Sequence, residues 1–313
     1  MINPNAKGAR VALAQRSSFW GRHFNDSLLE VPPNVASIPR ALERLQRKGV
    51  RVLAMLGGDG TIQQTVTAAN KIWGAEQRPA ALILKGGTAN ALAKNMGIRS
   101  KPGDLLRTYL ARVSQGRTDG IRIHDVPMLE VEDGFDHTIR HGFIFAGGLV
   151  YESIRRYRES KNPGPLEIFK QAAYPLWARW FDRDGGKDYF KSPRMTIDID
   201  GRMHIDDPIH VLTLATLQKL TLWYAPFSGD ISSTNRFYGM INHQDADEAF
   251  AHFFDLALGR KDMPRNVNGL FEEVCIETTA GYVLDGELYA RSQPYRVRIT
   301  RGPSLRVLTL TGI

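Results

Sequence analysis

Two apolar strands, each followed by glycines and a helix, dominate the first hundred residues. The segment GVRVLAML, residues 49–56, is an apolar run of the length expected for a buried parallel strand, and AALILK, residues 80–85, is a second. Helix-compatible sequence follows them over residues 61–73 and 89–96. An amphipathic helix precedes both, because the apolar residues of IPRALERLQRKG recur at a helical spacing. Strands that alternate with helices predict a parallel sheet covered on both sides.

The pattern changes near residues 116–120. Downstream segments are short and strand-like, and several are separated by Asp-Gly turn signals, at residues 133–134, 200–201 and 285–286. Helical stretches interrupt these strands at residues 149–160, 166–181 and 246–258. We therefore expect an α/β domain over residues 1–118 and a β-rich domain over residues 119–313.

The charge of the chain favours anionic partners. It has 313 residues, a net charge of +8 and a pI near 9.6. Such a surplus of positive charge suits nucleotide phosphates or acidic lipid surfaces. The basic residues are spread along the chain rather than gathered in a tail, so we do not expect a nucleic-acid partner.

The cysteine content and the hydropathy favour the cytoplasm. Cys275 is the only cysteine, which excludes an internal disulfide, and its strand-like surroundings predict a small buried hydrophobe. No run of about 18 apolar residues suggests a membrane span. The segment MINPNAKGAR also lacks the apolar core of a signal peptide.

The two glycine turns are the strongest candidates for chemistry. GGDG, residues 57–60, and GGTAN, residues 86–90, both lie where a strand passes into a helix, and the backbone N–H groups there suit a phosphate. Neither turn has the pattern of a Walker loop or a Rossmann fingerprint. A tight strand-to-helix connection is the alternative. Asp59 favours the phosphate site, on condition that Mg²⁺ or a hydroxyl group lies between its carboxylate and the phosphates.

Four motifs together resemble one family. GGDGT is followed by GGTANALAKN, while an Asn-Pro stands near the start and LDGELY near the end. This order is similar to that of the diacylglycerol kinase catalytic-domain family, which includes diacylglycerol, sphingosine and ceramide kinases. GGDGT alone is shared with NAD kinases. The resemblance implies an amino-terminal α/β domain like that of NAD kinase, and a carboxy-terminal domain of antiparallel strands.

The resemblance also implies an activity and its residues. The family transfers the γ-phosphoryl group of ATP to a lipid hydroxyl with Mg²⁺. Asp285 and Glu287 would include the general base, and Asp59 would lie beside the metal and the phosphates. A loose candidate for a further metal ligand is Asp230. The residues expected to bind the nucleotide are Asn3, Gly58, Asp59, Gly60, Thr61, Gly87, Thr88 and Asn90.

Departures from the family keep other functions open. Gln63 and Gln64 stand where the family often has Asn-Glu, and Ala91 stands where it often has Asp. An NAD kinase-like enzyme with a soluble substrate is one alternative. A catalytically silent protein that binds lipid or nucleotide is another. The Asp-Gly pair at residues 285–286 is also a hairpin signal without any chemistry.

Two helical stretches are candidates for contact with a membrane surface. Residues 151–161 carry several arginines that suit acidic headgroups, although a solvated helix face is the alternative. Residues 169–183 combine Trp177 and Trp180 with arginines, which fits either an interfacial helix or a core stripe. We expect a cytoplasmic protein that associates peripherally with membranes. A homo-oligomer is compatible with this sequence.

Overall fold

The computed structural model describes residues 1–4, 28–159, 192–220, 226–227, 229–231, 234–243, 265–290 and 293–312. The chain forms two compact units, one of Met1–Met128 with Pro303–Ile313 and one of Leu129–Gly302. Each unit is described by itself below. Among the described residues, no helix combines the length and the apolar character that crossing a membrane requires.

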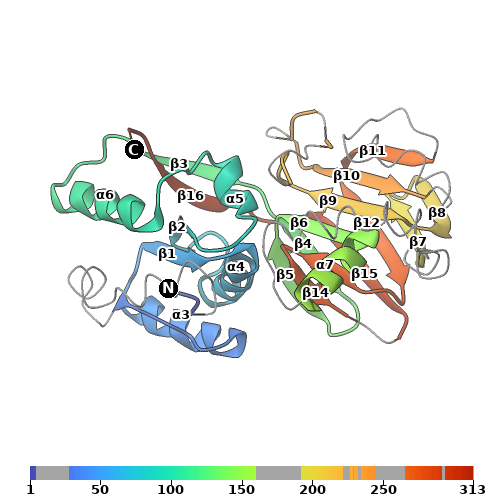
Figure 1. Cartoon of the computed structure of the whole chain (residues 1–313), viewed down its shortest axis with the longest axis horizontal. Coiled ribbons are helices and arrows are strands. Elements are labelled where there is room, and N and C mark those ends of the chain that lie inside the picture. Colours follow the sequence, from blue (N-terminus) through green and yellow to red (C-terminus); the bar gives the residue numbers. More distant parts are fainter. Residues whose placement is uncertain are drawn as a thin grey trace. The chain divides into compact units, whose positions relative to one another are not determined.

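The first unit contains a four-stranded sheet in the order β1-β2-β16-β3. Strands β1 (Val52–Gly57) and β2 (Ala80–Lys85) run parallel, as the sequence predicts. Strand β16 (Leu305–Leu310) pairs in parallel with β2 and antiparallel with β3 (Ile121–Val126), so a strand from the end of the chain lies inside this sheet (Figure 1). The sheet is therefore mixed, with its parallel part at β1, β2 and β16.

Helices of the first unit follow the predicted pattern with one addition. The amphipathic helix is α3, whose Ile38, Ala41, Leu42 and Leu45 are buried. The helix after the first glycine turn begins at Asp59, and the helix after the second is a short one that begins at Ala91. The sequence pattern did not indicate α6, which begins at a proline. The bounds are η2 (Val35–Ser37), α3 (Ile38–Arg47), α4 (Asp59–Trp73), α5 (Ala91–Asn95) and α6 (Pro102–Ser114).

The boundary between the units differs from the expected one. Sequence reasoning places it after residue 118, whereas residues 119–128 and 303–313 lie in the first unit. The physical reason is the long-range pairing of β3 with β16, which begins at Val126 and Leu305. An alternating strand pattern reveals a strand but not its partner, so the return of the chain was not visible in the sequence.

The second unit contains two six-stranded antiparallel sheets, which agrees with the fold that the resemblance implies. Their orders are β11-β10-β9-β6-β13-β14 and β5-β4-β15-β12-β7-β8. Helix α7 (Leu149–Glu159) follows β6, close to the predicted 149–160, while the predicted helices at 166–181 and 246–258 lie outside the described residues. The strands are β4 (Leu129–Asp133), β5 (Thr138–Gly142), β6 (Ile144–Gly148), β7 (Arg194–Ile199), β8 (Met203–Pro208), β9 (Val211–Ala215), β10 (Phe237–Asn242), β11 (Asn266–Phe271), β12 (Glu273–Thr278), β13 (Tyr282–Leu284), β14 (Glu287–Tyr289) and β15 (Tyr295–Arg301).

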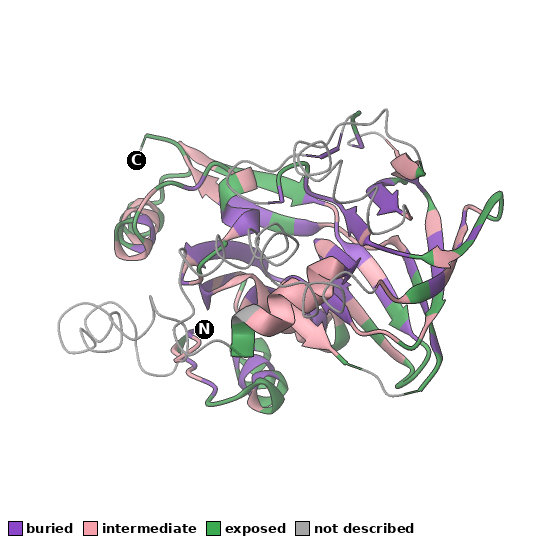
Figure 2. Ribbon diagram, turned by 45° about the vertical axis from the view of Figure 1, so that its right-hand side comes forward, coloured by how far each residue is buried: buried purple, intermediate pink, exposed green. Residues whose placement is uncertain are grey.

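The core of the second unit is built from alternating residues of its strands. In β15, Tyr295, Val297 and Ile299 are buried, whereas Arg296 and Arg298 between them are exposed. Buried and exposed residues alternate as bands along many of these strands (Figure 2). Burial of one large aliphatic side chain stabilises the fold by about 1.5–3 kcal/mol. The largest set of these buried residues forms a contiguous apolar cluster with members from both sheets, and a smaller cluster includes Ala215, Tyr238 and Met240.

Candidate functional site

The two glycine turns of the first unit contact each other through their backbones. The N–H of Gly86 donates to the carbonyl oxygen of Gly57 at 2.9 Å. A Cβ atom on Gly87 would lie 2.5 Å from the Cα atom of Gly58, and one on Gly58 would lie 3.2 Å from the Cα atom of Gly87. Larger residues at these positions would push the turns apart. The glycines therefore have a structural role in addition to any role in binding.

Asn90 closes the second glycine turn. Its Oδ1 accepts from the N–H of Gly87 at 3.0 Å, and its Nδ2 donates to the carbonyl oxygen of the same residue at 2.6 Å. The residue has a φ of 50°, in the left-handed region that asparagine tolerates better than most residues. The amide group thus shapes the turn, while Thr88 at its tip is exposed.

Asp59 has a buried carboxylate at the start of α4. Its Oδ1 atom has no hydrogen-bond partner among the described residues. Burial raises the pKa of Asp59, and the backbone N–H groups of Leu92, Ala91 and Asn90 oppose that shift by stabilising the anion. The carboxylate therefore lies at the beginning of α5, where it accepts from the N–H groups that would otherwise be open to an anion.

Asn3 joins the first glycine turn to the start of the chain. Its Nδ2 donates to Oγ1 of Thr61 at 2.7 Å, and its backbone N–H donates to the carbonyl oxygen of Leu56 at 2.9 Å. Ile2 forms a parallel bridge with Leu56 at the end of β1. The expected nucleotide residues of the first unit thus gather where β1 and β2 end, at the carboxyl edge of a parallel pair, where ligands of α/β folds often bind.

Two of the three positions that depart from the family are buried, whereas Gln64 is partly exposed. Gln63 is fully buried in α4, and its Nε2 donates to Oγ1 of Thr67 at 3.3 Å. Ala91 is 6% exposed, and its backbone N–H is one of those that stabilise the Asp59 anion. Gln63 is therefore a core residue of α4. Within the described residues there is no cluster of three or more acidic, histidine or cysteine side chains that could hold a metal ion.

A single carboxylate can be the only protein ligand of Mg²⁺ when phosphates bind the same ion. Mg²⁺ is often held by one or two carboxylates together with substrate phosphates and water. The unpartnered Oδ1 of Asp59 offers such a ligand in the first unit. Asp230 is exposed and belongs to the second unit, and no described acidic cluster surrounds it. The carboxylate of Asp59 thus fits a metal ion whose other ligands come from phosphates and water.

The Asp-Gly-Glu motif forms the tip of a hairpin in the second unit. Asp285 and Gly286 have φ values of 49° and 83°, and they connect Leu284 of β13 with Glu287 of β14. Two consecutive positive φ values are the signature of a type I′ turn, for which Asp-Gly is favoured. The hairpin that the sequence indicates at these residues is confirmed.

The two carboxylates of this hairpin have different surroundings. Asp285 is 7% exposed and accepts from the N–H of Phe143 at 3.0 and 3.1 Å and from that of Ile144 at 2.9 Å. Glu287 is partly exposed and forms an ion pair of 3.0 Å with Arg158, which also donates to the carbonyl oxygen of Gly286 at 2.6 Å. Asp285 thus anchors the hairpin to the start of β6, while Glu287 stays accessible.

All three arginines of α7 are paired with acidic side chains. Arg155 forms ion pairs with Glu152 at 2.5 Å and with Glu159 at 2.8 Å, and Arg156 pairs with Glu152 at 2.9 Å. Arg158 pairs with Glu287. This pattern favours the solvated, internally paired helix face over a surface for acidic headgroups. The stretch with Trp177 and Trp180 lies outside the described residues.

Sequence reasoning missed a buried polar network near the hairpin. Asp133 was assigned only to a turn, yet it is fully buried at the end of β4. Its Oδ2 accepts from the hydroxyl of Tyr282 at 2.8 Å and from Arg140 at 3.3 Å. Burial raises the pKa of Tyr282, so the phenol stays protonated as a donor. An aspartate before a glycine gives no signal that distinguishes this network from an exposed turn.

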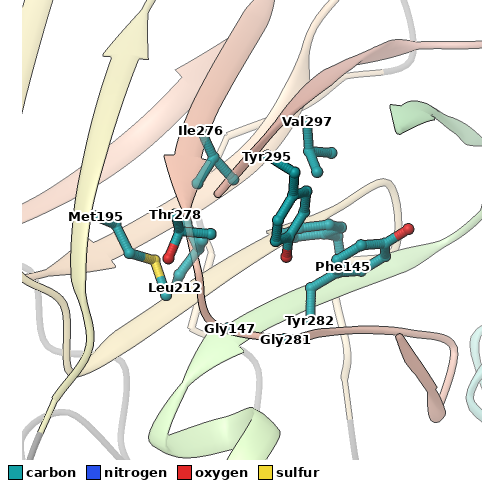
Figure 3. Close-up of a pocket in the computed structure, with 10 residues that line it drawn as sticks. All are labelled: Phe145, Gly147, Met195, Leu212, Ile276, Thr278, Gly281, Tyr282, Tyr295 and Val297. Atoms are coloured by element: carbon teal, nitrogen blue, oxygen red, sulfur yellow. The ribbon is translucent and has the colours of Figure 1, made fainter. Parts of the chain in front are cut away.

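A small apolar cavity lies among the strands of the second unit. Its volume is about 10 Å³, and the rings of Phe145, Tyr282 and Tyr295 line it together with Met195 and Leu212 (Figure 3). Phe145 and Tyr282 are stacked with their ring centroids 4.9 Å apart. A cavity of this size has room for about one water molecule. It is therefore too small for an acyl chain.

Comparisons with known proteins confirm the resemblance to the family. Residues 29–122 match the model of the diacylglycerol kinase catalytic domain. No curated protein sequence matches the chain. A solved structure of a candidate diacylglycerol kinase from Bacillus anthracis is 14% identical, with a TM-score of 0.63 over 95% of this chain and 92% of that one. A second structure, of a diacylglycerol kinase from the same organism, is 14% identical with a TM-score of 0.59, over 96% of this chain and 92% of that one. The fold is thus shared along nearly the whole chain.

The contact between the glycine turns predicts a specific cost of adding one methyl group. We expect Gly87→Ala to lower the free energy of unfolding by about 1–3 kcal/mol, because the new Cβ atom collides with Gly58. Gly103→Ala in α6 is the matched control, since nothing lies within 4 Å of its Cβ position, and a gain of about 0.4–1 kcal/mol is expected there. Urea denaturation measures both. Equal unfolding midpoints for the two variants would contradict the contact.

The raised pKa of Asp59 predicts a pH-dependent stability. Because its folded pKa lies above its unfolded value, the native state binds the proton more tightly, and stability decreases as the pH rises from the unfolded toward the folded pKa. Asp59→Asn removes this titration. We expect the difference in unfolding free energy, wild type minus variant, to decrease between about pH 4 and pH 7. Denaturant unfolding at both pH values measures it, and a difference that increases with pH would show that the carboxylate is not penalised by burial.

Proposed function

We propose that this chain is an ATP-dependent lipid kinase that transfers the γ-phosphoryl group of ATP to a lipid hydroxyl. The observation that carries the proposal is the pair of glycine turns at the ends of β1 and β2, with the buried carboxylate of Asp59 beside them. Both turns lie within the segment that matches the diacylglycerol kinase catalytic domain. The names of the similar structures support a kinase, and ATP, Mg²⁺ and the lipid acceptor belong to the proposal.

The glycine turns would bind the nucleotide through its phosphates. Gly58, Gly60 and Gly87 have no side chain that would keep a phosphate away from the backbone, and the N–H groups of Gly58 and Gly60 would be its donors, because the N–H of Gly87 donates to Asn90. The hydroxyl groups of Thr61 and Thr88 add donors, and Asn3 orients the first of them by donating to its Oγ1. Asn90 supports this site by holding the second turn in shape. Mg²⁺, when bound, would neutralise charge on the transferred phosphoryl group, with Asp59 as its protein ligand.

Glu287 is the better candidate for the general base. It is partly exposed and next to a cation, whereas both oxygens of Asp285 accept from backbone N–H groups. In the proposed step, the carboxylate of Glu287 takes the proton of the lipid hydroxyl. The oxygen of that hydroxyl bonds to the γ-phosphorus at the same time. The bond from that phosphorus to the bridging oxygen breaks, and ADP leaves. Arg158 would hold the Glu287 side chain in place.

A silent binding protein is the second candidate. It is favoured by Gln64 and Ala91, since these positions supply no second carboxylate to the Asp59 site. An enzyme that phosphorylates NAD is a further outcome that the same experiment recognises. Peripheral association with membranes belongs to the main proposal and is supported by the net charge of +8.

Incubation with labelled ATP and Mg²⁺ tests the proposal directly. Vesicles that contain diacylglycerol, vesicles that contain a sphingoid base, and soluble NAD serve as three separate acceptors. We expect label in the lipid fraction, and we expect Asp59→Ala to abolish it while the far-ultraviolet circular dichroism is unchanged. Label in NAD alone would select the soluble-substrate enzyme. Binding of ATP without transfer to any acceptor would select the silent protein.

The two carboxylates of the hairpin should respond in different ways to loss of charge. We expect Glu287→Gln to lower kcat by about a hundredfold or more, with little change in unfolding, because a general base is lost. Asp285→Asn should lower the free energy of unfolding by about 1–3 kcal/mol, since it weakens the acceptors of two buried N–H groups. Glu277→Gln, on an exposed position of β12, is the matched control for charge. Unchanged kcat in Glu287→Gln would remove it from the mechanism.

A further inference from the structure

A second cavity lies in the first unit, away from the glycine turns. It has a volume of about 240 Å³ and lies between the segment after α5 and the ribbon of β3 and β16. No residue of either glycine turn lines it. The volume is somewhat below the range of pockets for drug-sized ligands, which suits a small molecule or a headgroup.

Cationic and hydroxyl groups gather on one wall of this cavity. Arg122 lies opposite Thr309 in the register of β3 and β16, so their side chains share one face of the ribbon. By the same alternation His124 and Thr311 belong to that face, and Nε2 of His124 lies 2.8 Å from Oγ1 of Thr309. The strands thus present a guanidinium, an imidazole and hydroxyl groups together.

The opposite wall adds a second guanidinium. Arg99 and Ser100 come from the segment between α5 and α6, and the carbonyl oxygen of Arg99 accepts from Nζ of Lys85 at 2.7 Å. Burial, and then the charge of nearby Lys94, lower the pKa of Lys85. No aspartate or glutamate is among the residues that line the cavity. In the part of the chain that the structure describes, neither Arg99 nor Arg122 forms an ion pair.

A third arginine, Arg112, supports Thr311, one of the residues that line the cavity. Arg112 of α6 donates through Nη2 to the carbonyl oxygen of Thr311 at 2.9 Å. Its Nη1 is buried and has no hydrogen-bond partner among the described residues. Because Nη1 lies close to Gly120 and not among the lining residues, Arg112 supports this wall and is not assigned to the ligand.

We propose that this cavity binds a phosphomonoester group, carried either by a small soluble molecule or by a lipid headgroup. Arginine forks match the geometry of phosphate oxygens, and the hydroxyl groups of Ser100, Thr309 and Thr311 supply further donors. Apolar side chains of Ile98 and Leu105 line the rest of the cavity and suit the body of the ligand. The site does not depend on the proposed kinase activity.

Titration calorimetry with inorganic phosphate, and sedimentation with vesicles of phosphatidate in phosphatidylcholine, distinguish the two sources. We expect at least one probe to bind the wild-type chain, and Arg99→Gln and Arg122→Gln each to weaken that binding by about tenfold or more. Both arginines are exposed, so the substitutions should leave the fold intact. Arg40→Gln, on the exposed face of α3, removes the same charge and should have no effect.

Each outcome decides for or against the cavity. If the wild-type chain binds inorganic phosphate and both cavity variants lose that binding, the ligand is a soluble molecule. If the chain sediments with phosphatidate vesicles but does not bind inorganic phosphate, and both variants lose the sedimentation, the ligand is a lipid headgroup. Equal weakening by Arg40→Gln would show a diffuse effect of charge and overturn the proposal. Absence of binding of either probe would overturn it too. So would phosphate binding that is insensitive to Arg99→Gln and Arg122→Gln, because that phosphate would lie elsewhere, such as at the glycine turns.

Discussion

The candidate site of the first unit depends on the close backbone contact between its two glycine turns. Gly57 and Gly86 share a hydrogen bond, and Gly58 and Gly87 approach within a distance that leaves no room for a side chain. This contact fixes where α4 and α5 begin. It thereby places the carboxylate of Asp59 beside the first N–H groups of α5. A tight connection and a phosphate site, which the sequence left as alternatives, are compatible, because the glycines that the contact requires also leave the backbone open at the place where we propose that a phosphate binds.

Local patterns predicted the local structure well. Strand β2 spans the predicted residues 80–85, and the buried face of α3 contains the apolar residues that recur at helical spacing. Tertiary pairing was not predictable in the same way. The partners of Asp285 lie 141 and 142 residues away in the chain, and β16 pairs with strands from the first half. Sequence motifs could therefore locate the turns of the candidate site but not the contacts that bury Asp285 or Asp133.

The Asp-Gly-Glu hairpin combines a buried structural aspartate with a partly exposed glutamate, which we propose as the general base. The aspartate tolerates the left-handed conformation and accepts backbone N–H groups, whereas the glutamate two residues later stays partly exposed beside Arg158. Another Asp-Gly turn with positive φ uses its aspartate in a similar way, because Asp200 accepts from the N–H groups of Glu272 and Glu273. Anchoring by the aspartate is thus a property of the turn, and only the glutamate makes the motif at residues 285–287 different.

The position of β16 constrains the order in which the first unit can form. During synthesis on the ribosome, β1, β2 and β3 emerge early, but the strand that belongs between β2 and β3 emerges only after the entire second unit. Until then β2 has an unpaired apolar edge, and β3 has no partner in its sheet. The second unit can complete its own two sheets first, because all of their strands lie between Leu129 and Gly302. The unit that is first in the sequence is therefore the last to be completed.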